Sequence, residues 1–147
     1  MFISNQHLIN LLSSDEKIME HVDDLLQTWS QSFSIFKIGI TGNPKIRKYG
    51  HILRKWVEEP NFLEEFGLNP KDFSQSRRPW KEMVIIYKSD NPNRIKNLER
   101  KLITEYSLIK RNKPFNNNFT CWNIAPGGEG PLKSKNSISY YLYILIG

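Results

Sequence analysis

The chain has 147 residues, which suits one domain large enough to bury a core without disulfides or a structural metal ion. Its 21 lysines and arginines against 15 aspartates and glutamates give a net charge of +6, which favours a polyanionic partner over an acidic or neutral one. The single cysteine, Cys121, excludes an intrachain disulfide and a cysteine-based zinc site, and the lack of a secretion signal or a long apolar run predicts an intracellular, soluble protein without a membrane partner.

The first predicted element is an amphipathic helix. Ser13 and Glu16 have the spacing of a capping box, in which each side chain satisfies a backbone amide of the other residue. Apolar side chains then recur on one helical face: Ile18, Val22, Leu25, Leu26 and Trp29. We expect residues 1–32 to form a helical extension that packs on a larger unit, residues 33–147.

A strand and a second helix follow. Phe33–Ile40 is typical of a strand, and it ends at a turn in which Asn43 can cap a helix that begins with Pro44. One face of that helix is basic and contains Arg47, His51, Arg54 and Lys55. Such a face is usually just solvated, but it also suits a phosphate group, and the residues alone leave both interpretations open.

The second half of the chain contains another strand, another helix and a final strand. The prolines and glycine of residues 60–79 indicate an insertion made of short turns. Met83–Tyr87 is a compact β-branched strand, and Asn91 followed by Pro92 begins a helix that continues to about Lys110. Tyr140–Ile146 is the last predicted strand.

Glu99 occupies an unusual place in the last predicted helix. It falls inside an apolar arc formed by Ile95, Leu98, Leu102, Ile103, Tyr106 and Ile109. A carboxylate on a packed face loses solvation, so it requires a cation, a metal ion or a hydrogen-bond donor. A metal ligand and a salt-bridged glutamate at the margin of the arc are both compatible with this position.

Four pieces of the chain, taken in order, resemble the GIY-YIG nuclease family. Phe36–Thr41 resembles the second strand of the family, the YIG element, with Gly39 in place and Lys37 where the tyrosine stands. Arg47, eight residues after Gly39, matches the catalytic arginine of the family, and His51 matches a histidine or tyrosine one turn later.

The other two pieces lie further along the chain. Asn97–Ile103 resembles the helix that carries the metal-binding glutamate of the family, which would be Glu99. Trp122–Ile124, followed by the glycines of residues 127–130, is similar to the closing motif in which an asparagine supports the site, here Asn123. The resemblance covers residues 35–130.

The first strand of the family, the GIY element, is missing from its usual place. Leu25–Thr28 stands there and is typical of a helix without a tyrosine. The nearest likeness is Tyr140–Leu145 at the other end of the chain, which a circular permutation would explain, with Tyr143 as the missing tyrosine. The alternative is that these residues form an unrelated docking strand.

We therefore expect an α/β (α+β) fold, with a small and mainly antiparallel three-stranded sheet flanked by helices. The expected strands are Phe33–Ile40, Met83–Tyr87 and Tyr140–Ile146, with the last directly beside the first. The resemblance implies a divalent-metal-dependent endonuclease that hydrolyses DNA phosphodiester bonds with an activated water and Mg²⁺ (or Mn²⁺).

The resemblance also implies a role for each residue of the site. Glu99 would bind the metal ion, and Arg47 would hold phosphate oxygens through its planar guanidinium. Tyr143 would orient or deprotonate the water, and Lys37 would favour a tyrosinate or bind phosphate. The remaining residues would act as follows: His51 as a secondary acid, base or phosphate contact, Asn123 as a support, and Arg54 and Lys55 as DNA contacts.

Two other classes of protein remain compatible with the sequence. A catalytically inactive GIY-YIG-like relative would keep the fold as a DNA-binding or protein-interaction module, as the missing GIY strand suggests. A purely structural basic α/β protein would instead join Glu99 to Arg47 in a salt bridge.

Overall fold

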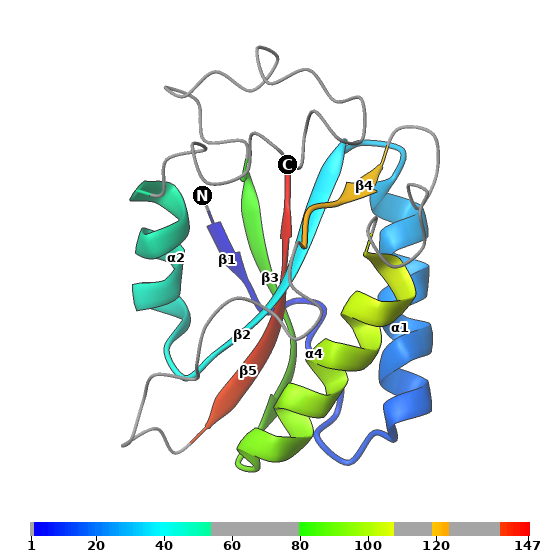
Figure 1. Cartoon of the computed structure of the whole chain (residues 1–147), viewed down its shortest axis with the longest axis vertical. Coiled ribbons are helices and arrows are strands. Elements are labelled where there is room, and N and C mark those ends of the chain that lie inside the picture. The colour runs from blue at the N-terminus through cyan, green and yellow to red at the C-terminus, as the bar shows by residue number, and fades with distance from the viewer. Residues whose placement is uncertain (1, 54–79, 108–118, 124–138) are drawn as a thin grey trace.

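The computed structural model describes residues 2–53, 80–107, 119–123 and 139–147, and the predicted insertion at residues 60–79 lies outside them. Within these ranges the strands are β1 (Phe2–Ser4), β2 (Ile35–Thr41), β3 (Glu82–Ser89), β4 (Thr120–Cys121) and β5 (Tyr140–Ile146). The helices are α1 (Asp15–Trp29), α2 (Pro44–Leu53) and α4 (Pro92–Tyr106) (Figure 1).

The described strands form one mixed sheet in the order β1-β3-β5-β2-β4. β5 lies at its centre and pairs antiparallel with β2 on one side and with β3 on the other. The two edge strands pair in parallel, β1 with β3 and β4 with β2. The prediction that the Tyr140–Ile146 strand lies directly beside the Phe33–Ile40 strand is therefore confirmed.

The predicted three-stranded, mainly antiparallel sheet is wrong, because the sheet has five strands and mixed pairing. The three predicted strands form its centre, and the two missed strands are its edges. β1 has 3 residues and β4 has 2, which is too short to show the alternation over about four or more residues by which a strand is recognised. Residues 2–4 lie within the predicted helical extension, but they form β1 and are therefore part of the sheet.

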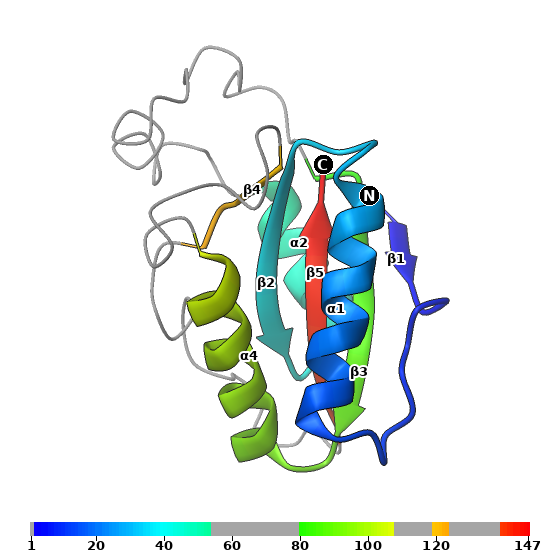
Figure 2. The same ribbon diagram turned by 90° about the vertical axis from the view of Figure 1, so that its right-hand side faces the viewer.

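Helices cover both faces of the sheet (Figures 1 and 2). α1 and α4 lie side by side on one face, and α2 lies on the other. Alternate residues of β5 supply two separate apolar clusters: Leu142, Ile144 and Ile146 pack with α1 and α4, whereas Tyr143 and Leu145 pack with residues such as Trp80. No helix in the described parts of the chain is both long and apolar enough to cross a membrane.

Side-chain caps set the start of each described helix. Asn91 accepts hydrogen bonds from the amides of Asn93 and Arg94, and Asn43 accepts one from the amide of Ile46, as the sequence predicted. α1 is capped by Ser14 and not by Ser13. The extended backbone of Ser14 brings its hydroxyl within 3.2 Å of the amide of Lys17, and the carbonyl of Ser13 instead accepts a hydrogen bond from Arg94.

Polar contacts join α1 to α4 beside the apolar core. Asp15 contacts Lys101 at 2.9 Å and Arg94 at 3.2 Å, and Tyr106 donates a hydrogen bond to Asp23 at 2.8 Å. The hydrogen bond from Lys101 is the largest of the effects that hold the pKa of Asp15 below its ordinary value. The N-terminal helix is thus fixed to the helix that carries Glu99.

Candidate functional site

Strand pairing brings two predicted site residues to one face of the sheet. Phe36, Ile38 and Ile40 of β2 pack with α1 and α4, so Lys37 and Gly39, which alternate with them, point to the opposite face. Tyr143 pairs directly with Gly39 and belongs to the cluster on that opposite face. Lys37 is 5% exposed and Tyr143 is 2% exposed, so both side chains are buried.

The ring of Tyr143 lies directly over Gly39. A Cβ atom built on Gly39 would overlap the hydroxyl oxygen, Cζ and Cε2 of Tyr143. The backbone of Gly39 lies outside the left-handed region, so the requirement for glycine here comes from the space that the tyrosine ring fills. The glycine of the YIG-like segment and the tyrosine of the last strand are therefore fitted to each other.

We expect Gly39→Ala to destabilise the protein by about 1–3 kcal/mol, the usual cost of overpacking a core. Without the tyrosine ring the same change should stabilise, because alanine is better than glycine in a strand by roughly 0.5–1 kcal/mol. Urea unfolding of the wild type, Gly39→Ala, Tyr143→Leu and the double variant measures this coupling. Leucine lacks the ring atoms that the new methyl group would meet, so an equal cost of Gly39→Ala in both backgrounds would contradict the close contact.

Asn123 extends the pairing of β2 with β4 by one step through its side chain. The amides of Thr120 and Trp122 donate to the carbonyls of Ser34 and Phe36 in the regular pattern of a parallel pair. At the next position Asn123 replaces the backbone: its Oδ1 accepts from the amide of Ile38 at 2.8 Å, and its Nδ2 donates to the carbonyl of Ile38 at 2.7 Å. The amide group of Asn123 thus fixes the backbone between Lys37 and Gly39.

Two neighbours hold Asn123 in turn. Ser107, at the end of α4, donates to its carbonyl at 3.3 Å, and the thiol of Cys121 donates to its Oδ1 at 3.2 Å. Burial raises the pKa of the Cys121 thiol to about 12, so this cysteine stays protonated at neutral pH and serves as a donor and not as a nucleophile.

Arg47 lies in the first turns of α2, on the same side of the sheet as Lys37 and Tyr143 (Figures 1 and 2). Its side chain is partly exposed. Its backbone amide donates to the carbonyl of Asn43 at 3.1 Å, which anchors it one turn after the β2–α2 connection. His51 belongs to α2, but its side chain lies outside the described residues, as do Arg54 and Lys55.

Glu99 lies on α4, which packs on the other side of the sheet. It is 5% exposed, as expected for a carboxylate inside the apolar arc of the helix. The structure therefore brings Lys37, Tyr143 and Asn123 to the strand pair β2–β5 and its edge, with Arg47 on the adjacent helix. It does not bring Glu99 to the face of the sheet on which Lys37 and Tyr143 lie.

The donor set for a metal ion is small. The described residues contain no group of three or more histidine, cysteine, aspartate or glutamate side chains that could hold one. Glu99 alone offers a carboxylate among the predicted site residues. Such a set fits Mg²⁺ only in the manner of sites that use one or two carboxylates, with water and substrate phosphates as the other ligands.

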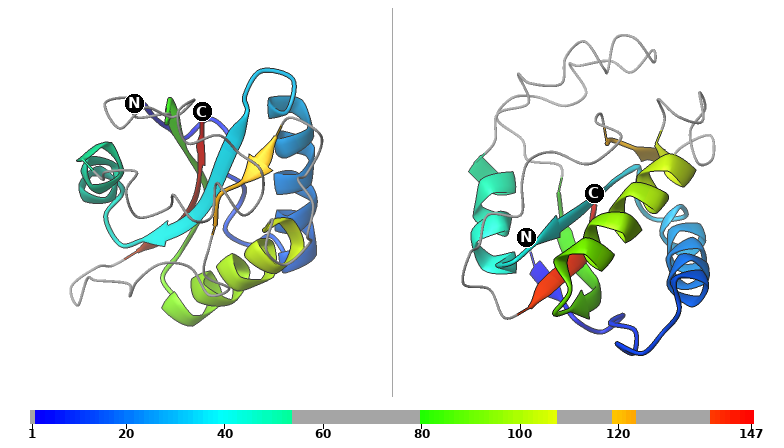
Figure 3. Two further views of the ribbon diagram at one scale, coloured as in Figure 1. Left: turned by 45° about the horizontal axis from the view of Figure 1, so that its top comes forward. Right: turned by 60° about the horizontal axis from the view of Figure 1, so that its bottom comes forward.

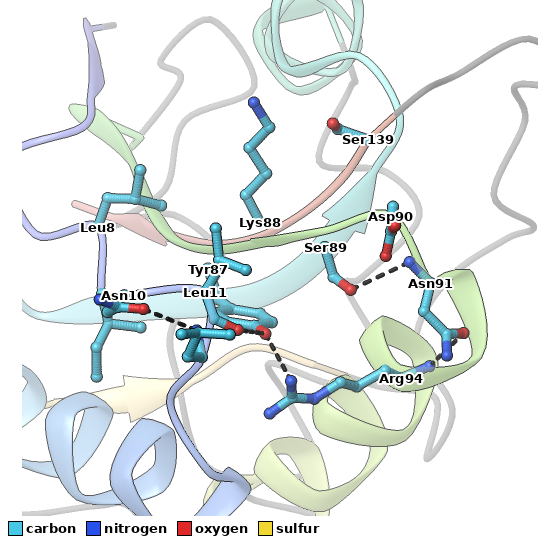
Figure 4. A pocket seen from close by; sticks show the side chains of 12 residues that line it. Leu8, Asn10, Leu11, Tyr87, Lys88, Ser89, Asp90, Asn91, Arg94 and Ser139 are labelled. Carbon is cyan, nitrogen blue, oxygen red and sulfur yellow. Dashed lines mark hydrogen bonds between the residues drawn. The ribbon is translucent and has the colours of Figure 1, made fainter.

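An open groove of about 820 Å³ lies elsewhere, at the start of α4 (Figure 4). Its lining includes Leu8, Leu11, Leu12, Lys88 and Arg94. None of the predicted site residues lines it. This groove was not predicted from the sequence. Its leucines, Leu8, Leu11 and Leu12, are exposed, and they follow neither the helical nor the strand periodicity by which an element is recognised.

Comparison of the chain with protein-family models, with curated proteins and with solved structures found no match.

Proposed function

We propose that the protein is a divalent-metal-dependent endonuclease that hydrolyses DNA phosphodiester bonds, with a circularly permuted, GIY-YIG-like arrangement of its strands. One observation carries the proposal: β5 pairs with β2 so that Tyr143 lies over Gly39, on the face that also contains Lys37. In the GIY-YIG family the GIY strand pairs with the YIG strand. The pairing of β5 with β2 supports β5 as the counterpart of the GIY strand.

Each residue would contribute a distinct part of the chemistry. Arg47 is a partly exposed residue whose guanidinium would bind two oxygens of one phosphate, and its charge persists at any pH near neutral. Tyr143 would orient the attacking water through its hydroxyl, and Lys37 would balance negative charge on the phenolic or phosphate oxygen.

His51 would serve as a second phosphate contact, with Arg54 and Lys55 further along the DNA. Asn123 would act at a distance, by fixing the β2 backbone at Ile38.

Glu99 is the residue that would bind Mg²⁺ or Mn²⁺, since carboxylate oxygen is the ligand that such hard cations prefer. When bound, the metal ion would neutralise charge that develops on the phosphate. This part of the proposal requires the Glu99 carboxylate to be within reach of a phosphate that Arg47 also contacts.

A second candidate function is supported by the position of Glu99. Because this glutamate lies on the helix that covers the opposite face, the chain is also compatible with a catalytically inactive DNA-binding or protein-interaction module. Such a module would keep the basic face of α2 and need no metal ion.

Incubation with supercoiled plasmid distinguishes the two functions. We expect the purified chain to convert supercoiled DNA into nicked or linear forms with Mg²⁺ and to leave it intact with EDTA, as resolved on an agarose gel. DNA retained by the protein without any metal-dependent nicking would favour the inactive module.

A further inference from the structure

The charged side chains of the described helices are distributed unevenly between the two sides of the sheet. α2 has no acidic residue anywhere in its sequence, and its first turns contain Lys45, Arg47 and Lys48. The side chain of Lys45 is exposed and that of Arg47 is partly exposed. α2 lies on one side of the sheet and α1 and α4 lie on the other (Figure 3), and Lys37 and Tyr143 point to the side of α2.

The opposite side presents a line of carboxylates on α1. Glu16, Glu20 and Asp24 are exposed and lie four residues apart, so they form one stripe along the outer surface of the helix. Like charges at this spacing repel one another and destabilise the helix. Lys17 is the one lysine or arginine in the α1 sequence.

α4, which lies beside α1, has some cationic side chains that are paired with α1 and others that are exposed on its outer face. Arg94 and Lys101 are engaged with Asp15 of α1. Lys96 and Arg100 are exposed on the outer face of α4. A polyanion that approached this side would therefore meet the α1 carboxylates next to these two cations.

We infer that duplex DNA binds against the α2 side of the sheet and is repelled from the outer surface of α1 by the Glu16–Glu20–Asp24 stripe. The inference rests on the proposed function, since it takes DNA as the ligand, and it adds the direction of approach. A phosphate neutralised by a lysine or arginine releases counterions, so each such contact adds about 0.9 to the slope of log K against log salt concentration. A lysine that faces solvent on the other side adds nothing to this slope.

Two matched lysine substitutions test this direction. Lys45→Ala and Lys17→Ala each remove one exposed cation from a helix and lower the net charge of the chain equally, so they differ only in the side of the sheet that they affect. Binding to a short fluorescein-labelled duplex is measured by anisotropy over a series of salt concentrations, with EDTA present so that the DNA stays intact. Lys96→Ala is measured in parallel as a probe of α4.

We expect Lys45→Ala to weaken binding and to reduce the salt slope by about 0.9, while Lys17→Ala and Lys96→Ala keep the wild-type slope. Equal effects of Lys45→Ala and Lys17→Ala would overturn the inference, and so would a larger effect of Lys96→Ala. In either case the plasmid assay of the wild type would still report on the proposed function. No salt-dependent binding by the wild type would overturn the inference and the DNA ligand together.

Discussion

Tyr143→Phe should fold like the wild type and lose about 10²- to 10⁴-fold in the rate of plasmid nicking, the range that a positioned acid or base contributes. The ring that fills the space over Gly39 is kept, so the packing between β2 and β5 is unchanged. Only the hydroxyl is removed. The rate is measured from the loss of supercoiled plasmid with Mg²⁺, and the fold from the thermal unfolding midpoint.

Tyr141→Phe is the matched control for this substitution. Tyr141 lies two residues away on β5, packs against the same cluster as Tyr143 and contacts Lys88 through its ring. It should tolerate loss of its hydroxyl without a change in rate. Full activity of Tyr143→Phe would show that the pairing of β5 with β2 has a structural role only.

Glu99→Gln should abolish metal-dependent nicking, by about 10²-fold or more, while the affinity for duplex DNA in EDTA stays at the wild-type value. The expected size follows from the several kcal/mol of transition-state stabilisation that a metal ion supplies, at about 1.4 kcal/mol for each factor of ten. Glutamine has the size of glutamate and can still form hydrogen bonds, so this buried position should remain packed.

Glu105→Gln provides the control on the same helix, because Glu105 is exposed and lies outside the buried face of α4. Its rate should match the wild type. If Glu99→Gln nicked DNA as fast as this control, the Glu99 carboxylate would be a structural group of the α4 face and not the metal ligand. Loss of both nicking and stability would instead mean that the site cannot be separated from the fold at this residue.

The elements that could be predicted from the sequence were those with strong periodicity or a clear cap. The buried stripe of α1 and the Asn91–Pro92 start of α4 are local signals, and both are present as expected. The β5 strand was also predictable from its run of large apolar residues, and the alternation along it placed Tyr143 and Leu142 on opposite faces, as observed. β1 and β4 could not be found, since each is stabilised by its partner strand and not by a pattern of its own.

The candidate site was harder to predict because its residues meet through the tertiary fold. The fit of Tyr143 over Gly39 depends on a register between segments about a hundred residues apart, which no local pattern contains. The side of the sheet on which Glu99 lies depends on how α4 packs, and the sequence indicated its burial but not the layer. The role of Asn123 at the β2 edge was suggested only by the family resemblance.

The central position of β5 also affects how the chain can fold. β1 and β3 form one pair of strands and β2 and β4 another, and β5 is the strand that joins the two pairs within the described sheet. Neither pair can close the sheet before Tyr140–Ile146 is available, although β2 ends at residue 41 and β3 at residue 89. During synthesis the apolar faces of these earlier strands therefore stay without their central partner until the last strand has left the ribosome. Formation of the sheet is then a non-local step, which is the kind of topology that folds slowly and leaves unpaired strands exposed to aggregation.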